Sequence, residues 1–243
     1  MKGLLERDMG PMNAFQWLEV IGVSVLTAIF ALSDKANGPL YLIANSAASV
    51  SGITCVALCA GRKKSQYYWG FANILAYSYI SWQNSYFGEV MLNMLYYLPL
   101  QFAGLREWSK NRADEEGRVK TRRMKPAEAA LAACGALAAI WLYMLLLSRI
   151  GGKAVWLDSS TTILSLAANM LMVLRYREQW IIWIAVDAIT VVMWAVAGDA
   201  IMTTTWSFFL INAVYGLIVW SKAESGKEGT GDAEIGERSE KHE

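Results

Sequence analysis

The chain has 243 residues, of which 55% are hydrophobic and only 18% are charged, and its formal net charge is +1. This balance gives no basis for a nucleic-acid partner. The charged residues gather in short clusters between long apolar runs. A bilayer core of about 30 Å needs about 20 apolar residues per helical span, so the pattern predicts a membrane protein and argues against a soluble one.

The apolar runs predict an all-α, polytopic membrane protein with about eight transmembrane helices. The first run lacks the short apolar core and the small-residue cleavage site of a signal peptide, so it is interpreted as a transmembrane helix. From about Lys222 the chain is rich in Gly, Glu and Lys without apolar periodicity, which predicts a disordered tail over 223–243. The predicted helices span 13–33, 39–60, 66–84, 86–110, 127–149, 154–175, 178–197 and 199–222.

The basic residues predict the orientation, because cytoplasmic loops of membrane proteins carry an excess of Lys and Arg. With the N-terminus in the cytoplasm, eight spans leave only Lys35, Arg149 and Lys153 of the 22 basic residues outside. Several predicted helices are short and semi-polar, but a seven-span model spoils this segregation unless the first span is the one removed. Both termini are therefore predicted to be cytoplasmic.

An internal repeat is visible when the predicted helices are aligned. The sequence GRKKSQYYW at 61–69 matches RYREQWIIW at 175–183 with an offset of 114, and LREWSK at 105–110 matches LIVWSK at 217–222 with an offset of 112. An odd number of helices per unit plus a connector gives two parallel units, an arrangement known among secondary transporters. The alignment predicts three-helix bundles at 39–110 and 154–222. A basic loop and a linker helix at 111–149 join them, and 13–33 is an extra N-terminal helix.

Polar side chains at membrane depth usually face a bundle interior or an aqueous cavity. Asp187 is the sharpest candidate, since no basic residue in its predicted helix can pair with it. Spacings of three, four and seven place Trp180, Trp183 and Asp187 on one helical face. Trp69 and Asn73 are predicted to hold the matching positions in the first unit. Aromatic rings beside a polar acceptor suit a planar and polar ligand, above all a cation.

The same residue types also have structural explanations. Tryptophans near the ends of spans anchor a helix at the interface, and this explanation stays open for Trp180 and Trp183. Asn and Gln within spans often form hydrogen bonds between helices. Amide-bearing candidates of this kind are Asn45, Asn73, Asn93, Gln101, Asn169 and Asn212.

Enzymatic and metal functions find little support. The three cysteines lie inside apolar runs and are interpreted as packing residues, and the single histidine, His242, is in the polar tail. Phosphate-binding loops, catalytic triads and metal clusters are absent from the sequence. The sequence thus predicts a protein that is not an enzyme and has no metal or cofactor.

Three stretches carry a resemblance to a known family. The segment LINAVYGLIVWSK near the C-terminus, the stretch from Trp180 to Asp187, and the order Tyr96, Tyr97, Gly104, Trp108 are similar to the PnuC family of nicotinamide riboside transporters. The resemblance covers about 39–222. It implies a carrier of the bacterial inner membrane with two three-helix units joined by a linking helix, related to SWEET proteins and assembled as a trimer. It also implies facilitated diffusion of the unphosphorylated riboside, which a cytoplasmic kinase then traps as the mononucleotide.

The resemblance further implies a substrate site. Trp183 and Trp180 would flank the nicotinamide ring, Asp187 would lie near its positive charge or a ribose hydroxyl, and Asn212 would bind the carboxamide or ribose. The first unit would contribute Asn73, Asn93, Tyr97 and Gln101. Two alternatives stay open: a carrier for another vitamin or a nucleoside, such as thiamine or riboflavin, and a membrane enzyme or scaffold that transports nothing.

Overall fold

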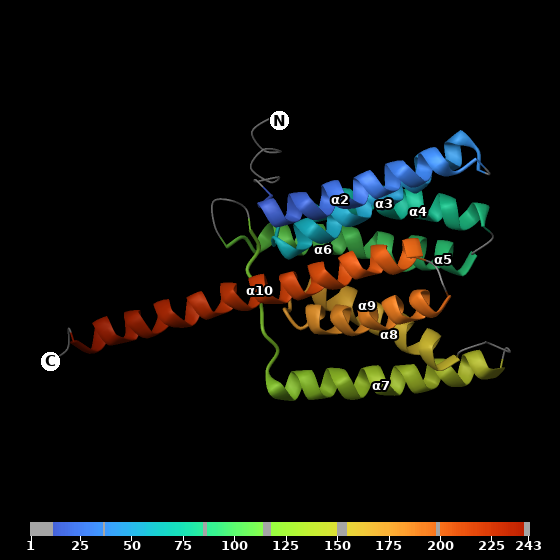
Figure 1. Ribbon diagram of the computed structural model, residues 1–243. Coiled ribbons are helices and arrows are strands. Elements are labelled where there is room, and N and C mark those ends of the chain that lie inside the picture. The colour runs from blue at the N-terminus through green and yellow to red at the C-terminus, as the bar shows by residue number, and fades with distance from the viewer. Residues whose placement is uncertain are drawn as a thin grey trace.

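The computed structural model describes residues 12–35, 37–84, 87–113, 118–149, 155–197 and 200–240, and the described parts of the chain form the predicted all-helical fold. The helices lie roughly alongside one another in one bundle (Figure 1). They are α2 (Ala14–Ser33), α3 (Pro39–Ala60), α4 (Gln66–Gln83), α5 (Phe87–Leu92), the π-helix η1 (Asn93–Tyr97), α6 (Leu98–Lys110), α7 (Pro126–Arg149), α8 (Val155–Val173), α9 (Gln179–Ala197) and α10 (Ala200–Glu240).

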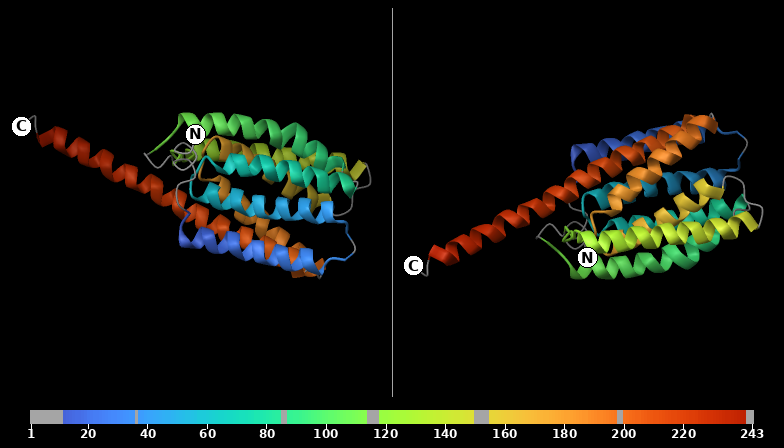
Figure 2. Two further views of the ribbon diagram at one scale, coloured as in Figure 1. Left: turned by 90° about the horizontal axis from the view of Figure 1, so that it is seen from above. Right: turned by 90° about the horizontal axis from the view of Figure 1, so that it is seen from below.

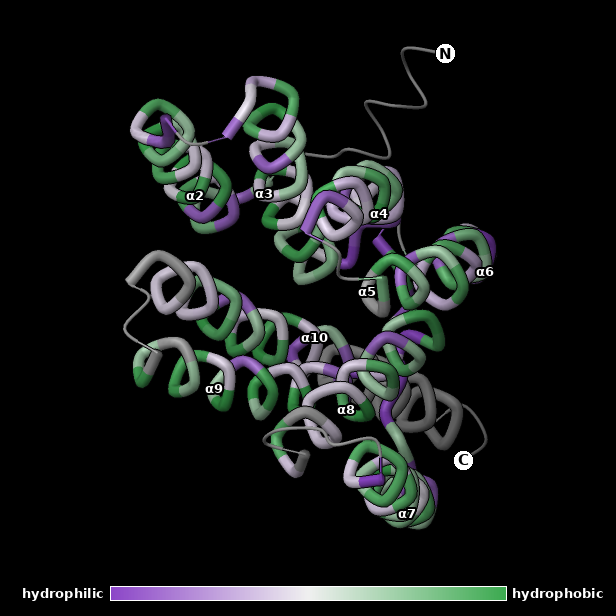
Figure 3. Tube along the Cα trace, turned by 90° about the vertical axis from the view of Figure 1, so that its right-hand side faces the viewer, coloured by the Kyte–Doolittle hydropathy of each residue, from purple (hydrophilic) through white to green (hydrophobic). Residues whose placement is uncertain are grey.

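The exposed apolar side chains of this bundle are explained by contact with lipid. Four stretches are long and apolar enough to cross a membrane by length and composition, namely 14–33, 39–60, 126–149 and 203–224, and α8 and α9 hold shorter apolar stretches. Helix α7 buries only Ile140 among its side chains, while Leu131 is 76% exposed. Figure 3 shows apolar residues all round this helix. An apolar surface of this size in water would be an aggregation liability, so it faces lipid.

The segments α5, η1 and α6 form one continuous helix, as predicted for 86–110. Leu92 and Leu98, which flank η1, keep helical dihedral angles, so the chain does not break there. Pro99 explains the wider turn, because its ring clashes with the carbonyl one turn earlier and it offers no backbone N–H. Such π-turns often occur at functional sites.

The turns that join the first two helices of each unit correct the predicted offset of the repeat. Arg62 and Arg175 are the residues with positive φ outside glycine in the described chain, at 60° and 66°, and each stands in the turn that joins the first two helices of a unit. They lie 113 residues apart, so the first half of the repeat has an offset of 113. The predicted offset of 114 is wrong there, because it aligned two tryptophans by identity, whereas the strained turn determines which residues coincide.

This shift of one residue changes the predicted pairs. Trp183 corresponds to Gly70 instead of Trp69, and Asp187 corresponds to Ile74 instead of Asn73. Trp183 and Asp187 therefore have no like counterpart in the first unit.

The repeat also extends beyond the predicted three-helix units. The residues of α2, shifted by 113 positions, fall within the bounds of α7. Helix α2 contacts α3, the first helix of the first unit, and α7 contacts α8, the first helix of the second unit. Helices α2 and α7 lie at opposite edges of the bundle (Figures 1 and 3). The extra helix and the linker helix are therefore related positions of one duplicated arrangement.

The C-terminal part of α10 differs from the prediction, and the linker before α7 makes contacts that were not predicted. Helix α10 continues to Glu240 and projects away from the bundle (Figure 2), whereas the sequence predicted a disordered tail from 223. The linker before α7 forms isolated bridges between Lys63 and Arg118 and between Arg122 and Tyr176, so it touches the turn between the first two helices of each unit.

Each unit has one glycine that allows close packing against an aromatic ring, Gly104 in the first unit and Gly216 in the second. A methyl group added at Gly216 would lie 2.6 Å from the Trp180 ring, and one added at Gly104 would overlap the Tyr67 ring. We expect Gly216→Ala to lower the unfolding temperature of the purified protein, with a loss of about 1–3 kcal/mol from overpacking.

The matched control is Gly135→Ala on α7, where an added methyl group meets nothing within 4 Å. This change replaces a helical glycine by alanine and should leave stability unchanged or raise it by about 0.5–1 kcal/mol. Differential scanning fluorimetry compares the two. An equal response of both variants would show that the contact between Gly216 and Trp180 does not limit packing.

Candidate functional site

The two units meet along two seams that are related by the repeat. Helix α3, the first of the first unit, packs against α10, the last of the second, and α8 packs against α6 in the corresponding way. A solute that passes between the units must pass these seams. The candidate site is therefore built from the polar side chains that the seams bury.

A reciprocal pair of hydrogen bonds closes one end of the interface, the end at which α3 and α8 finish. Trp108 Nε1 donates to the carbonyl oxygen of Met172 at 3.0 Å, and Trp220 Nε1 donates to that of Cys59 at 3.2 Å. Cys59 and Met172 are 113 residues apart, so each unit binds the equivalent carbonyl of the other. Both indoles are fully buried, with ring centroids 5.8 Å apart. The units are thus joined at the pseudo-symmetry axis.

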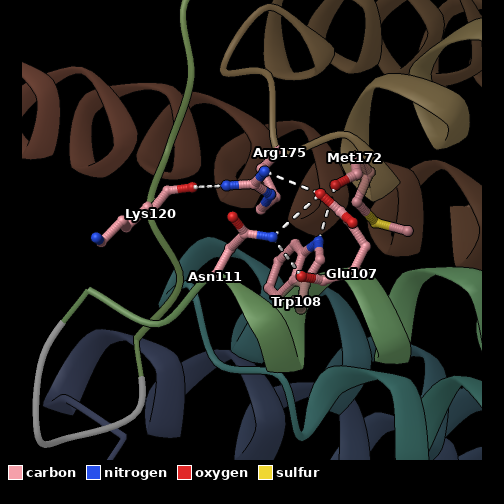
Figure 4. A network of polar contacts seen from close by, with 6 residues as sticks. All are labelled: Glu107, Trp108, Asn111, Lys120, Met172 and Arg175. Carbon is pink, nitrogen blue, oxygen red and sulfur yellow. Dashed lines mark hydrogen bonds and ion pairs between the residues drawn. The ribbon is translucent and has the colours of Figure 1, made fainter.

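An ion pair adds to this closure. Arg175 Nη2 lies 2.9 Å from Glu107 Oε1, and Arg175 Nη1 donates to the Lys120 carbonyl oxygen at 3.1 Å. The carboxylate of Glu107 also accepts from Asn111 at 3.1 Å. Figure 4 shows that these groups surround the bond between Trp108 and Met172. One arginine of the second unit thereby joins the last helix of the first unit to the linker.

Trp180 lies within this closed end. Its ring meets Trp220 edge-on at 5.9 Å and packs on Gly216. Tyr67, its equivalent at an offset of 113, meets Trp108 edge-on at 5.3 Å and packs on Gly104. The shared geometry assigns Trp180 a packing role within its unit, and contact with a ligand stays a prediction for this residue.

A small polar cavity lies on the seam between α6 and α8. Its volume is about 10 Å³, which is close to the space one water molecule occupies. Two predicted residues, Tyr97 and Gln101, line it together with Asn169, and Gln101 Oε1 is buried without a hydrogen-bond partner in the described structure. Tyr67, Leu100 and Met172 complete the lining and were not predicted. The described conformation is closed around this polar centre.

The other predicted amides lie elsewhere in the bundle. Asn212 is 1% exposed and donates from Nδ2 to the Val56 carbonyl oxygen at 3.2 Å, across the seam between α3 and α10. Asn73 donates to the Ala48 carbonyl oxygen at 2.7 Å and thereby joins α3 to α4 within the first unit. Asn93 is buried in η1. Of these three amides, Asn212 is the one seen to connect the two units.

Asp187 and Trp183 are in the second unit. Asp187 is 3% exposed on α9, the helix that packs against α8 and α10. Trp183 is half-buried and packs against the cluster of buried residues at the end closed by the tryptophans. The carboxylate is therefore shielded from lipid, and the indole lies between that cluster and Asp187 along the helix.

Glu19 is a buried polar residue that the sequence analysis overlooked. It is 2% exposed on α2, and both carboxylate oxygens are buried without a hydrogen-bond partner in the described chain. Gln16, one turn earlier, donates to the Ala57 carbonyl oxygen at 2.5 Å. The signal was available, since a glutamate within an apolar run is as unusual as the aspartate at 187.

A wider depression of about 400 Å³ opens at the other end of the bundle. It is lined by residues at the start of α3 and the end of α4, including Tyr41, Tyr79 and Asn84. Asn84 donates to the Tyr41 hydroxyl at 3.1 Å. The end opposite the tryptophan closure therefore has a polar opening.

Duplicated helical units, lipid-facing surfaces and polar residues buried at the unit interface define the class of protein as a membrane carrier. The family model described as nicotinamide mononucleotide transporter matches residues 42–222, and the chain belongs to this family.

Relatives and a solved structure agree with this assignment. The nicotinamide riboside transporter PnuC of Neisseria mucosa is 35% identical over 187 residues, covering 73% of this chain and 71% of the relative. The protein of the same description from Haemophilus influenzae is 32% identical over 212 residues, covering 85% and 88%. A crystal structure of the vitamin B3 transporter PnuC superposes with a TM-score of 0.75 at 29% identity, covering 92% of this chain and 97% of the other.

The reciprocal tryptophan bonds generate a prediction about cysteine reactivity. Trp220→Phe removes the donor to the Cys59 carbonyl, which leaves a buried acceptor unpaired at a cost of about 1–3 kcal/mol. We expect the buried Cys59 thiol to react faster with N-ethylmaleimide in this variant. The measurement uses a background with both Cys55→Ala and Cys134→Ala, since these two cysteines are also free and Cys59 is then the remaining thiol.

Trp108→Phe is the matched control, because it breaks the equivalent bond at Met172 and leaves the bond at Cys59 intact. Equal labelling of Cys59 in both variants would contradict a local closing role of each bond.

Proposed function

We propose that this protein takes up nicotinamide riboside across the bacterial inner membrane by facilitated diffusion. The proposal is supported by its family, by the description of its relatives as nicotinamide riboside transporters, and by the polar groups buried between its units. The riboside joins a planar cationic ring to a sugar with three free hydroxyls. Aromatic rings, amides and a carboxylate suit these groups.

Charge favours the riboside over its 5′-phosphate, although the family description names the mononucleotide. The basic residues of the described spans lie at helix ends, as Arg106, Lys110 and Arg149 do, and none lies mid-span. A buried phosphate would lack a counter-charge and would face the carboxylate of Asp187, which is costly in a low-dielectric interior. Phosphorylation by a cytoplasmic kinase would then trap the solute inside.

The proposal includes the predicted topology and assembly. Both termini are cytoplasmic, which places the tryptophan closure and the basic linker inside and the wider opening outside. Three copies form the functional assembly. The exposed apolar face of α7 offers surface for lipid or for a second copy.

Binding of the riboside tests the proposal directly. We expect isothermal titration calorimetry with the purified protein to show heat of binding for nicotinamide riboside and none for its 5′-phosphate. Equal affinity for the phosphate would contradict the charge argument. Proteoliposomes that contain only this protein should accumulate labelled riboside to equilibrium, with competition by excess riboside and none by thiamine or riboflavin.

Trp183 provides the residue-level test. Trp183→Ala should weaken riboside binding by about 1–3 kcal/mol if the indole stacks on the ring, as base–aromatic stacking does elsewhere. Trp141→Ala is the matched control, since this tryptophan lies exposed on α7. Wild-type affinity in the Trp183 variant would remove the residue from the site.

A further inference from the structure

Glu19 is a buried acidic residue that the proposed site does not use. Gln16, Glu19 and Val23 form the face that α2 turns toward the rest of the bundle. Gln16 donates to the Ala57 carbonyl, whereas Glu19 has two buried oxygens without a donor among the residues that the structure describes. A buried carboxylate without a partner is unfavourable, so this position needs a ligand of opposite charge or a donor group.

Contacts on either side determine the depth of Glu19 in the bundle. Toward α10, the Gly22 backbone lies against Phe208, and the Phe15 ring stacks at 4.4 Å on Tyr215. Glu19 lies between Phe15 and Gly22 along α2, so it faces the stretch between Phe208 and Tyr215. Asn212 is the fully buried polar residue of that stretch.

Contacts with α3 place Glu19 at the same depth in the bundle. Gln16 contacts Ala57, and Thr27 shares a 2.7 Å hydrogen bond with Ser49, so Glu19 faces the residues between 49 and 57. The carbonyl of Val56, within that stretch, accepts from Asn212. Glu19 and Asn212 therefore lie at one level of a junction of α2, α3 and α10, on the seam between the two units.

The chemistry of this junction is one-sided. Within the described part of the chain, Asn212 Oδ1 is buried without a partner, as are both Glu19 oxygens, so three acceptor atoms there lack donors. The repeat does not require them, because the α7 positions related to Gln16 and Glu19 are Ala129 and Ala132. A carboxylate present in one seam and missing from its equivalent points to a ligand and away from a role in the scaffold.

Resting on the proposed function, we infer that Glu19 is a specificity-determining residue that supplies a counter-charge to the cationic ring of the riboside when the seam between α3 and α10 parts. Asn212 Oδ1 accepts a hydrogen bond from the carboxamide or a hydroxyl of the same molecule. The helix outside the three-helix unit thereby takes part in selecting the substrate.

The experiment compares the oxidised riboside with its reduced form, in which hydride addition to the ring removes the positive charge. We expect Glu19→Gln to weaken binding of the cationic riboside at least tenfold in calorimetry and to leave binding of the uncharged, reduced riboside within twofold. The matched control is Glu128→Gln on the exposed first turn of α7, which should alter neither affinity.

Each other outcome is informative. Unchanged affinity of the Glu19 variant for the cation overturns the inference and leaves the proposed function intact. An equal loss for both ligands also overturns it, because Glu19 would then act through packing. A charge-selective loss in Asp187→Asn with none in Glu19→Gln assigns the counter-charge to Asp187 alone. Wild-type protein that binds neither form overturns the proposed function itself.

Discussion

Two indole N–H groups hold the halves of this protein together. Trp108 and Trp220 each donate to a carbonyl that ends the first helix of the opposite unit, and their rings pack on one another at the pseudo-symmetry axis. In lipid, burial of apolar surface cannot join two helical units, since the solvent is as apolar as the side chains. Hydrogen bonds and close packing must do so. The tryptophan pair therefore defines the closed end on which the geometry of both seams depends.

Closure at one end has consequences for the rest of the interface. The ion pair between Arg175 and Glu107 and the linker bridges lie over the same end, while the opposite end carries a polar depression between α3 and α4 of the first unit. Along the seams, Gln101 Oε1 and Asn212 Oδ1 are buried without a hydrogen-bond partner among the described residues. A carrier needs this imbalance, because groups fully satisfied by the protein would have no reason to bind a solute.

The two units differ in their buried polar residues. Their packing corresponds at the end closed by the tryptophans, where Tyr67 on Gly104 matches Trp180 on Gly216. Their polar residues differ: Asp187 corresponds to Ile74, and Glu19 corresponds to Ala132. A symmetric scaffold with an asymmetric lining suits an asymmetric molecule such as a charged ring joined to a neutral sugar.

Composition and periodicity alone determined the all-helical membrane fold, the parallel repeat and the candidates Asp187 and Asn212, because the bilayer forces apolar runs outward and makes each polar exception conspicuous. Tertiary structure decided the register of the repeat, since it depends on the positive φ of Arg62 and Arg175, which residue identity does not reveal. It also decided that Trp180 packs within the closed end and that α2 brings Glu19 to the seam. Both depend on contacts between helices far apart in the chain, and one-helix periodicity carries no information about which helix a buried face will meet.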